Sequence, residues 1–198
     1  LTGVAWSTYE SLLADLAGES APRLTYDEGV LELMMPLAEH EQVNRTLALL
    51  IEIFAEESRI DVCNFGSATF HVEALRRGFE PDSCFYIQNE PVVRGKNRLD
   101  LAVDPPPDLG IEIEITSGAI RELHVYAAMG VPEVWRYDGD RLRMFELEGG
   151  TYSERSHSRA FPHLTAEAMT DWLARGSHVA RTTLLRDFRA WVRALTNA

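Results

Sequence analysis

The sequence has little lysine, little cysteine and no long apolar run. Lys96 is the single lysine, against 18 arginines. The two cysteines, Cys63 and Cys84, are too few for a disulfide framework and favour a protein of the reducing cytoplasm. Apolar runs such as residues 47–51 are far shorter than the roughly 18 residues of a membrane-spanning helix, and no basic segment precedes an apolar run at the N-terminus. We therefore expect neither a membrane segment nor a secretion signal.

The composition is that of one globular domain. The chain of 198 residues is 45% hydrophobic and 25% charged, which excludes disordered, collagen-like and coiled-coil classes. Because this length is short for two domains, we expect a single domain over residues 1–198. The net charge of -12 repels polyanions from most of the surface, so indiscriminate coating of nucleic acid is not expected.

Hydrophobic periodicity predicts an α/β domain. Apolar residues at helical spacing predict helices over 6–17, 36–57, 119–129, 166–174 and 182–195. Aromatic and β-branched stretches predict strands over 24–26, 30–34, 60–65, 69–72, 83–87, 109–115, 133–137 and 142–147, with another near residue 152. Gly66, Gly78 and Pro81 are expected to break these strands. Short turns that contain glycine predict β-hairpins for 24–34 and 133–147.

Two glutamates alternate with isoleucines in the strand predicted to be central, 109–115. Period-two alternation places Glu112 and Glu114 on one face, roughly 7 Å apart, and the isoleucines on the core face. On the surface of an antiparallel sheet this pattern is ordinary. On a strand buried on both faces, two like charges require partners or a metal ion. Spacing alone leaves both interpretations open.

A further acid, Asp82, stands at the start of the predicted strand 83–87. An Asp at one strand's start and a Glu-x-Glu pair on its neighbour is an arrangement by which nuclease sites gather oxygen ligands for Mg²⁺. This ion needs few carboxylates, keeps bound waters, lowers the pKa of such a water and neutralises charge on a phosphate.

Four motifs occur in a fixed order along the chain: Glu80-Pro81-Asp82, Pro106-Pro107-Asp108-Leu109, the run from Glu112 to Ser117, and the run from Tyr126 to Tyr137. Together they resemble the Uma2 family of restriction-endonuclease-like proteins in the PD-(D/E)XK nuclease superfamily. The resemblance is strongest over residues 24–152, and Glu39-His40-Glu41 agrees with the family's acid-and-His helix start. It implies a mixed sheet flanked by helices, here with an extra N-terminal hairpin and C-terminal helices.

The resemblance also implies roles for single residues. Asp82 and Glu112 match the two acids that bind Mg²⁺ (or Mn²⁺). Glu114 stands where the superfamily's lysine would be, and as an acid it would serve as a further ligand or general base. The lysine that many relatives carry on the next helix is also absent, which leaves Arg121 as the candidate cation. His40 is either a site residue or a satisfied core histidine.

Three functions are consistent with these features. The first is a metal-dependent endonuclease that hydrolyses DNA, expected as a homodimer because cutting both strands usually takes two symmetry-related sites. The second is a catalytically inactive protein of the same fold that binds nucleic acid or a protein partner. The third is an acidic interaction domain whose carboxylate pair is only a solvated strand face. Two basic clusters, one at Arg76 and Arg77 and one at Arg94, Lys96 and Arg98, are either solvated faces or phosphate contacts.

Overall fold

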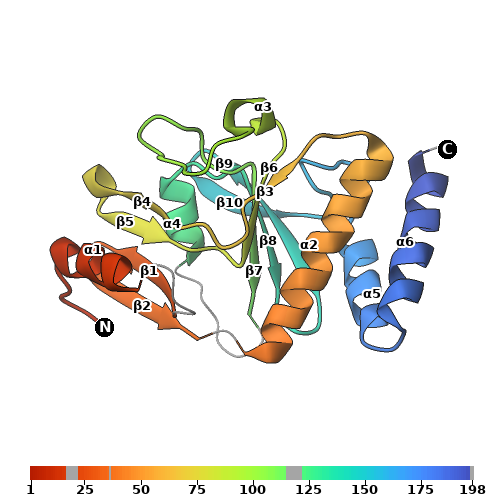
Figure 1. Cartoon of the computed structure of the whole chain (residues 1–198), viewed down its shortest axis with the longest axis horizontal. Helices are drawn as coiled ribbons and strands as arrows, with labels where there is room; N and C mark the ends of the chain where they lie inside the picture. Colours follow the sequence, from red (N-terminus) through yellow and green to blue (C-terminus); the bar gives the residue numbers. More distant parts are fainter. Residues whose placement is uncertain (17–21, 36, 115–121, 197–198) are drawn as a thin grey trace.

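A six-stranded mixed sheet forms the centre of the computed structural model, which describes residues 1–16, 22–35, 37–114 and 122–196 (Figure 1). Only the β7–β8 pair is parallel within this sheet. The strands in spatial order are β10 (Thr151–Arg155), β9 (Leu142–Glu148), β8 (Glu133–Tyr137), β7 (Leu109–Ile113), β6 (Ser83–Tyr86) and β3 (Cys63–Asn64).

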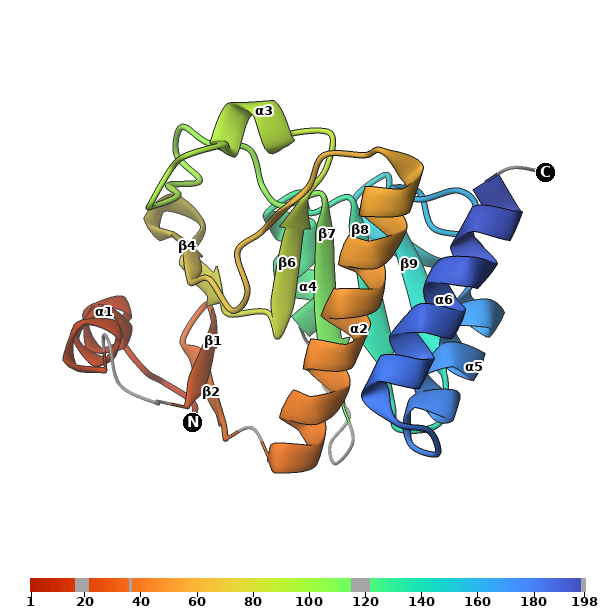
Figure 2. The same cartoon turned by 45° about the vertical axis from the view of Figure 1, so that its right-hand side comes forward.

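Helices cover both faces of this sheet (Figure 2). One face packs against α2 (Ala38–Ser58), α5 (Ala166–Gly176) and α6 (Arg181–Thr196), and the other against α4 (Glu122–Ala128). The alternation in β7 explains the division, because Ile111 and Ile113 join the core on the α2 side. All five residues of β7 are buried, so the expected central strand is confirmed and Glu112 does not lie on a solvated face.

The N-terminal hairpin belongs to a second, antiparallel sheet of four strands. Their spatial order is β2 (Val30–Met34), β1 (Arg23–Asp27), β5 (Arg77–Phe79) and β4 (Phe70–Val72). The helix α1 (Trp6–Asp15) shares a small aromatic core with it, in which the rings of Tyr9 and Tyr26 stack at 5.0 Å. The sequence predicted the hairpin but not the sheet around it.

Gly78 lies inside β5, so the expectation that it breaks a strand is wrong. A Cβ at this position would lie 2.7 Å from Cζ of Tyr9, closer than side-chain contacts allow. Glycine is needed here because a ring packs on the strand, not because the strand ends. The strand expected over 60–65 is also shorter, at Cys63–Asn64, and a short helix, α3 (Glu90–Val93), was not predicted.

The other expected elements are present with small changes of boundary, and the mixed α/β class is confirmed. Pro36, expected to begin the long helix, and the first residues of the helix expected from 119 lie outside the described residues. Among the residues that are described, no helix combines the length and apolar character needed to cross a membrane.

Candidate active site

Asp82 and Glu112 come from neighbouring strands, Asp82 immediately before β6 and Glu112 within β7. Ser83 of β6 pairs with Ile111 of β7, and the main-chain amide of Asp82 donates to the carbonyl of the same Ile111 at 3.0 Å, so Asp82 lies beside the residue that precedes Glu112. The Asp82 carboxylate also joins the ladder, because the amide of Ile113 donates a hydrogen bond to its Oδ2 at 2.6 Å. Both acids are buried, with 2% and 6% of their surface exposed. Two of the predicted site residues therefore share one location.

Side chains from β1 and α2 surround Asp82. Arg23 forms an ion pair with Asp82 Oδ1, and His40 places Nε2 3.2 Å from Oδ2. One helical turn later, Asn44 donates from Nδ2 to the main-chain oxygen of Asp82 at 2.9 Å and accepts from the hydroxyl of Ser83 at 2.9 Å. The start of α2 is thereby fixed to the start of β6, and His40 is both buried and part of the site.

Burial and charge set the protonation of these groups. Burial lowers the pKa of His40, and the positive charge of Arg23 lowers it further, so the imidazole is neutral at pH 7. Burial also lowers the pKa of Arg23, opposed by the negative charges of Glu112 and Glu41, and a guanidinium remains protonated regardless. Arg23 is therefore the cation that faces Asp82.

Tyr126 of α4 holds the second acid. Its hydroxyl donates a hydrogen bond to Glu112 Oε1. Its ring lies over Gly110 of β7, where a Cβ would stand 2.9 Å from Tyr126 Cε1, and it packs on Phe79 with centroids 4.2 Å apart. Glycine at 110 is thus required for the ring to reach the strand, and the ring in turn orients Glu112.

Glu114 has a different partner. Its carboxylate forms a two-point ion pair with Arg136 of β8, with Nε 2.7 Å from Oε1 in one of the two bonds. The structure therefore joins Glu114 to β8, while Arg23 and Tyr126 hold the other two acids. Arg121 lies outside the described residues. Within the described part of the chain, no group of three or more His, Cys, Asp and Glu side chains is arranged to hold a metal ion.

A cleft of about 500 Å³ gives access to Asp82. Three arginines contribute to its wall, Arg23, Arg45 and Arg181, and they offset the three acids that also line it, so the cleft is formally neutral on a chain of net charge -12. The wall also includes Asp82, Ser83, Glu41, Asn44, Ala48, Leu49, Glu52, Asn64, Gly66 and Ser67.

The two basic clusters noted in the sequence do not line this cleft. Arg77 pairs with Asp27 and Glu28, Arg94 with Glu90 and Asp61, and Lys96 with Asp104. These cations neutralise local acids. Lys96 is therefore committed to Asp104 and does not supply the superfamily's lysine.

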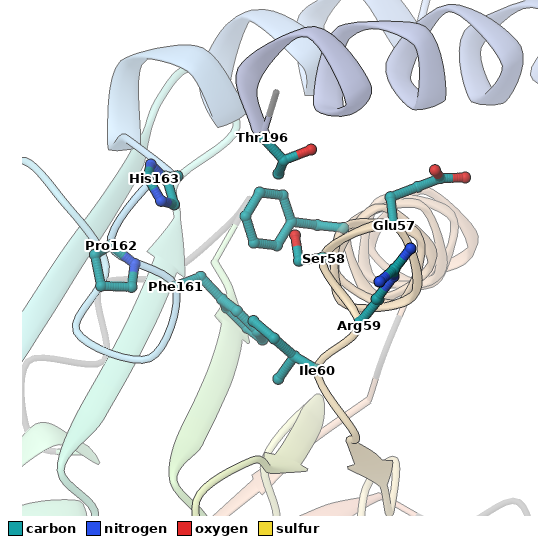
Figure 3. Close-up of a pocket in the computed structure, with 9 residues that line it drawn as sticks. Glu57, Ser58, Arg59, Ile60, Phe161, Pro162, His163 and Thr196 are labelled. Atoms are coloured by element: carbon teal, nitrogen blue, oxygen red, sulfur yellow. The ribbon is translucent and has the colours of Figure 1, made fainter. Parts of the chain in front are cut away.

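A second pocket, of about 510 Å³, lies at the other end of α2 (Figure 3). Glu57 is its single acid, and hydrogen bonds from Arg193 and Arg189 lower the pKa of this carboxyl to about 2. A carboxylate held by two arginines is a poor base and a poor metal ligand. The acid pair of the first site is absent here.

Sequence reasoning missed Arg23, Asn44 and Tyr126. Asn44 had a detectable signal, because it is a polar residue on the apolar stripe of the long helix, one turn after His40. Tyr126 appeared only as part of a family motif. Arg23 had no detectable signal in the sequence, because its contact with Asp82 depends on how the second sheet packs against the first.

The fold is that of a nuclease-like α/β protein, and comparison with known proteins supports this class. A crystal structure from Anabaena variabilis ATCC 29413, described as a "putative nuclease belonging to DUF820", superposes with a TM-score of 0.56 at 17% sequence identity. The match covers 77% of this chain and 92% of that chain. At this identity the similarity establishes a shared fold.

The model of the Uma2 family, described as "Putative restriction endonuclease", matches residues 6–175, and the chain belongs to this family. A comparison with functionally curated proteins gives no match. The family resemblance found in the sequence is confirmed.

Proposed function

We propose that this protein is a metal-dependent endonuclease that hydrolyses phosphodiester bonds in DNA. The observation that carries the proposal is the pair of buried acids, Asp82 and Glu112, brought together by adjacent strands beside a cleft to which three arginines contribute. A chain of net charge -12 repels a phosphate backbone over most of its surface, and this cleft, where three arginines offset three acids, repels it least. Membership of a restriction-endonuclease-like family supports the same activity.

The donor set fits Mg²⁺ or Mn²⁺. Mg²⁺ binds through one or two protein carboxylates and keeps several waters, so Asp82 and Glu112 would suffice as its protein ligands. When bound, the ion would activate a water and neutralise charge on the scissile phosphate. The further prediction that Glu114 is a ligand stays a prediction, and reaching the ion would require Glu114 to release Arg136.

The surrounding side chains prepare this pair of acids. Asn44 and the amide of Ile113 fix the position of Asp82, and Tyr126 orients Glu112. His40, neutral and 3.2 Å from Asp82 Oδ2, is placed to accept or relay a proton at Nε2.

The alternative is a catalytically inactive protein that binds nucleic acid through the same cleft. One observation favours it: the Asp82 carboxylate already has a cationic partner, Arg23, and the single lysine is engaged elsewhere. Under either proposal we expect a homodimer in a reducing cytoplasm, with Cys63 and Cys84 as free thiols.

Plasmid cleavage separates the two functions. Wild-type protein should nick or linearise DNA with Mn²⁺, and more weakly with Mg²⁺, whose coordination geometry is stricter. Glu112→Gln should reduce the rate by about 10²-fold or more because it removes a ligand charge. Glu52→Gln is the matched control, since Glu52 lines the same cleft and bonds only to Asn64 among the contacts described. Equal cleavage by wild type and Glu112→Gln would place the site elsewhere, and no cleavage by wild type would favour the inactive protein.

A further inference from the structure

Arg23 occupies an unusual position for an arginine. It belongs to the second sheet, yet its guanidinium reaches the first sheet, where it pairs with Asp82 Oδ1 and lies 3.5 Å from Glu41. Only 11% of its side chain is exposed. The amide of the next residue, Leu24, donates to Glu80 Oε2 at 2.9 Å, which fixes β1 beside the start of β6.

The two buried acids require a compensating positive charge. Burying two ionised carboxylates lowers the stability of the fold unless one of them is protonated or a cation lies next to them. Arg23 supplies that charge, because its guanidinium forms the ion pair with Asp82 Oδ1 and is only 11% exposed. The same carboxylates are those that would hold a divalent ion, so the guanidinium and the ion compete for them.

We infer that Arg23 is the exchangeable cation of this site: it neutralises Asp82 in the metal-free protein, is displaced by the divalent ion, and then binds the substrate phosphate. The inference rests on the proposed nuclease function and assigns to Arg23 the charge that the missing lysine provides elsewhere in the superfamily.

The chemistry of arginine fits these roles. A guanidinium stays protonated, so it can neutralise a phosphate without exchanging protons. Its planar fork pairs with a carboxylate and with a phosphate in the same two-point manner. Arg23 lines the cleft together with Glu41, which offers it a second partner when the ion takes Asp82.

A purely structural role for Arg23 predicts something different. If Arg23 only joined the two sheets, its loss would lower stability and metal affinity together. The exchange described above predicts that metal affinity rises while catalysis falls. The two roles are therefore distinguished by the sign of one binding measurement.

The experiment uses Arg23→Gln and Arg23→Lys, with Arg77→Gln as the matched control. Arg77 lies in the same sheet with 14% of its side chain exposed, but it pairs with Asp27 and Glu28. Mn²⁺ is titrated calorimetrically into metal-free protein, and plasmid cleavage is measured at saturating Mn²⁺. Arg23→Gln should bind Mn²⁺ about tenfold more tightly, the effect of removing a unit charge a few ångströms from a dication in a water-like dielectric. Its cleavage rate should fall by about 10²-fold.

Arg23→Lys keeps the charge, so its Mn²⁺ affinity should stay near that of wild type, while its cleavage should fall less than that of Arg23→Gln. Arg77→Gln should change neither quantity by more than about threefold. Circular dichroism checks that each variant is folded. If Arg23→Gln does not fold, Arg23→Lys still tests the inference. Cleavage by Arg23→Lys at the wild-type rate, together with reduced Mn²⁺ affinity, would overturn it.

Three outcomes contradict the inference in different ways. Unchanged or weaker Mn²⁺ binding by Arg23→Gln, in a wild type that cuts DNA, overturns the inference and leaves the nuclease function intact. Tighter binding with undiminished cleavage overturns the phosphate role. Absence of both Mn²⁺ binding and cleavage in the wild type and in every variant overturns the proposed function itself.

Discussion

Gly110→Ala tests whether the packing of Tyr126 on β7 sets the position of Glu112. The added Cβ would lie 2.9 Å from Tyr126 Cε1 and 3.5 Å from Cδ1. Carbon atoms in ordinary contact are about 3.5–4.0 Å apart, so the ring must move by roughly half an ångström or more. The ring has little room, because it is fully buried and packs on Phe79.

Overpacking of this kind costs about 1–3 kcal/mol of unfolding free energy. In a chain of this size each kcal/mol corresponds to roughly 2–4 °C in Tm. The displaced hydroxyl should also lose its bond to Glu112, so metal affinity and cleavage should fall together. Scanning calorimetry measures the first effect, and Mn²⁺ titration with plasmid cleavage measures the second.

Gly176→Ala is the control for a general effect of adding a methyl group. Its Cβ would meet Leu184 Cδ2 at 3.2 Å, a flexible side-chain end that can shift, so stability should change by no more than about 1 kcal/mol. If Gly110→Ala is as stable and as active as wild type, Tyr126 does not restrain Glu112 and the reasoning is wrong.

Three further predictions concern acids in or near the core and their partners. Tyr126→Phe removes only the hydroxyl and its hydrogen bond to Glu112, so the unfolding free energy should fall by about 1–3 kcal/mol. An unchanged unfolding free energy by calorimetry would refute that hydrogen bond. Burial raises the pKa of Glu133 in the folded protein. The stability that Glu133 contributes is therefore present below the unfolded pKa near 4.5 and is lost as pH rises through the higher folded pKa. The Tm of wild type relative to Glu133→Gln should decline from pH 4.5 to pH 8, and a constant difference would contradict this. Glu114→Lys should destabilise the protein by about 1–3 kcal/mol because the new ammonium group would face Arg136. Adding Arg136→Glu to the same chain should restore most of the lost stability. If the losses of the two single variants simply add, the pair is not coupled.

The sequence predicted those parts of the fold that depend on local pattern. The stripe of the long helix and the alternation in 109–115 depend on residues close together in the chain, and both are confirmed. Gly78 was misassigned because its environment is the ring of Tyr9, which comes from a distant helix. Local turn rules carry no information about such a contact.

The candidate site likewise contains residues that local sequence pattern predicts and residues that only the structure reveals. Motif order and strand pattern placed Asp82 and Glu112 at one location, because each motif begins or forms a neighbouring strand. The pairing of Glu114 with Arg136 depends on the parallel register of β7 and β8, and the approach of Arg23 depends on the docking of two sheets. Neither register nor docking is encoded in local spacing, so these partners required the structure.

Calorimetric titration of Mn²⁺ into metal-free protein tests the central claim most directly. The account predicts that the wild type binds one ion per chain at the Asp82–Glu112 site, that Glu112→Gln weakens this binding by at least about tenfold, and that Glu52→Gln leaves it within about threefold of wild type. Equal Mn²⁺ binding by wild type and a folded Glu112→Gln variant would contradict the claim that these two buried acids form the metal site.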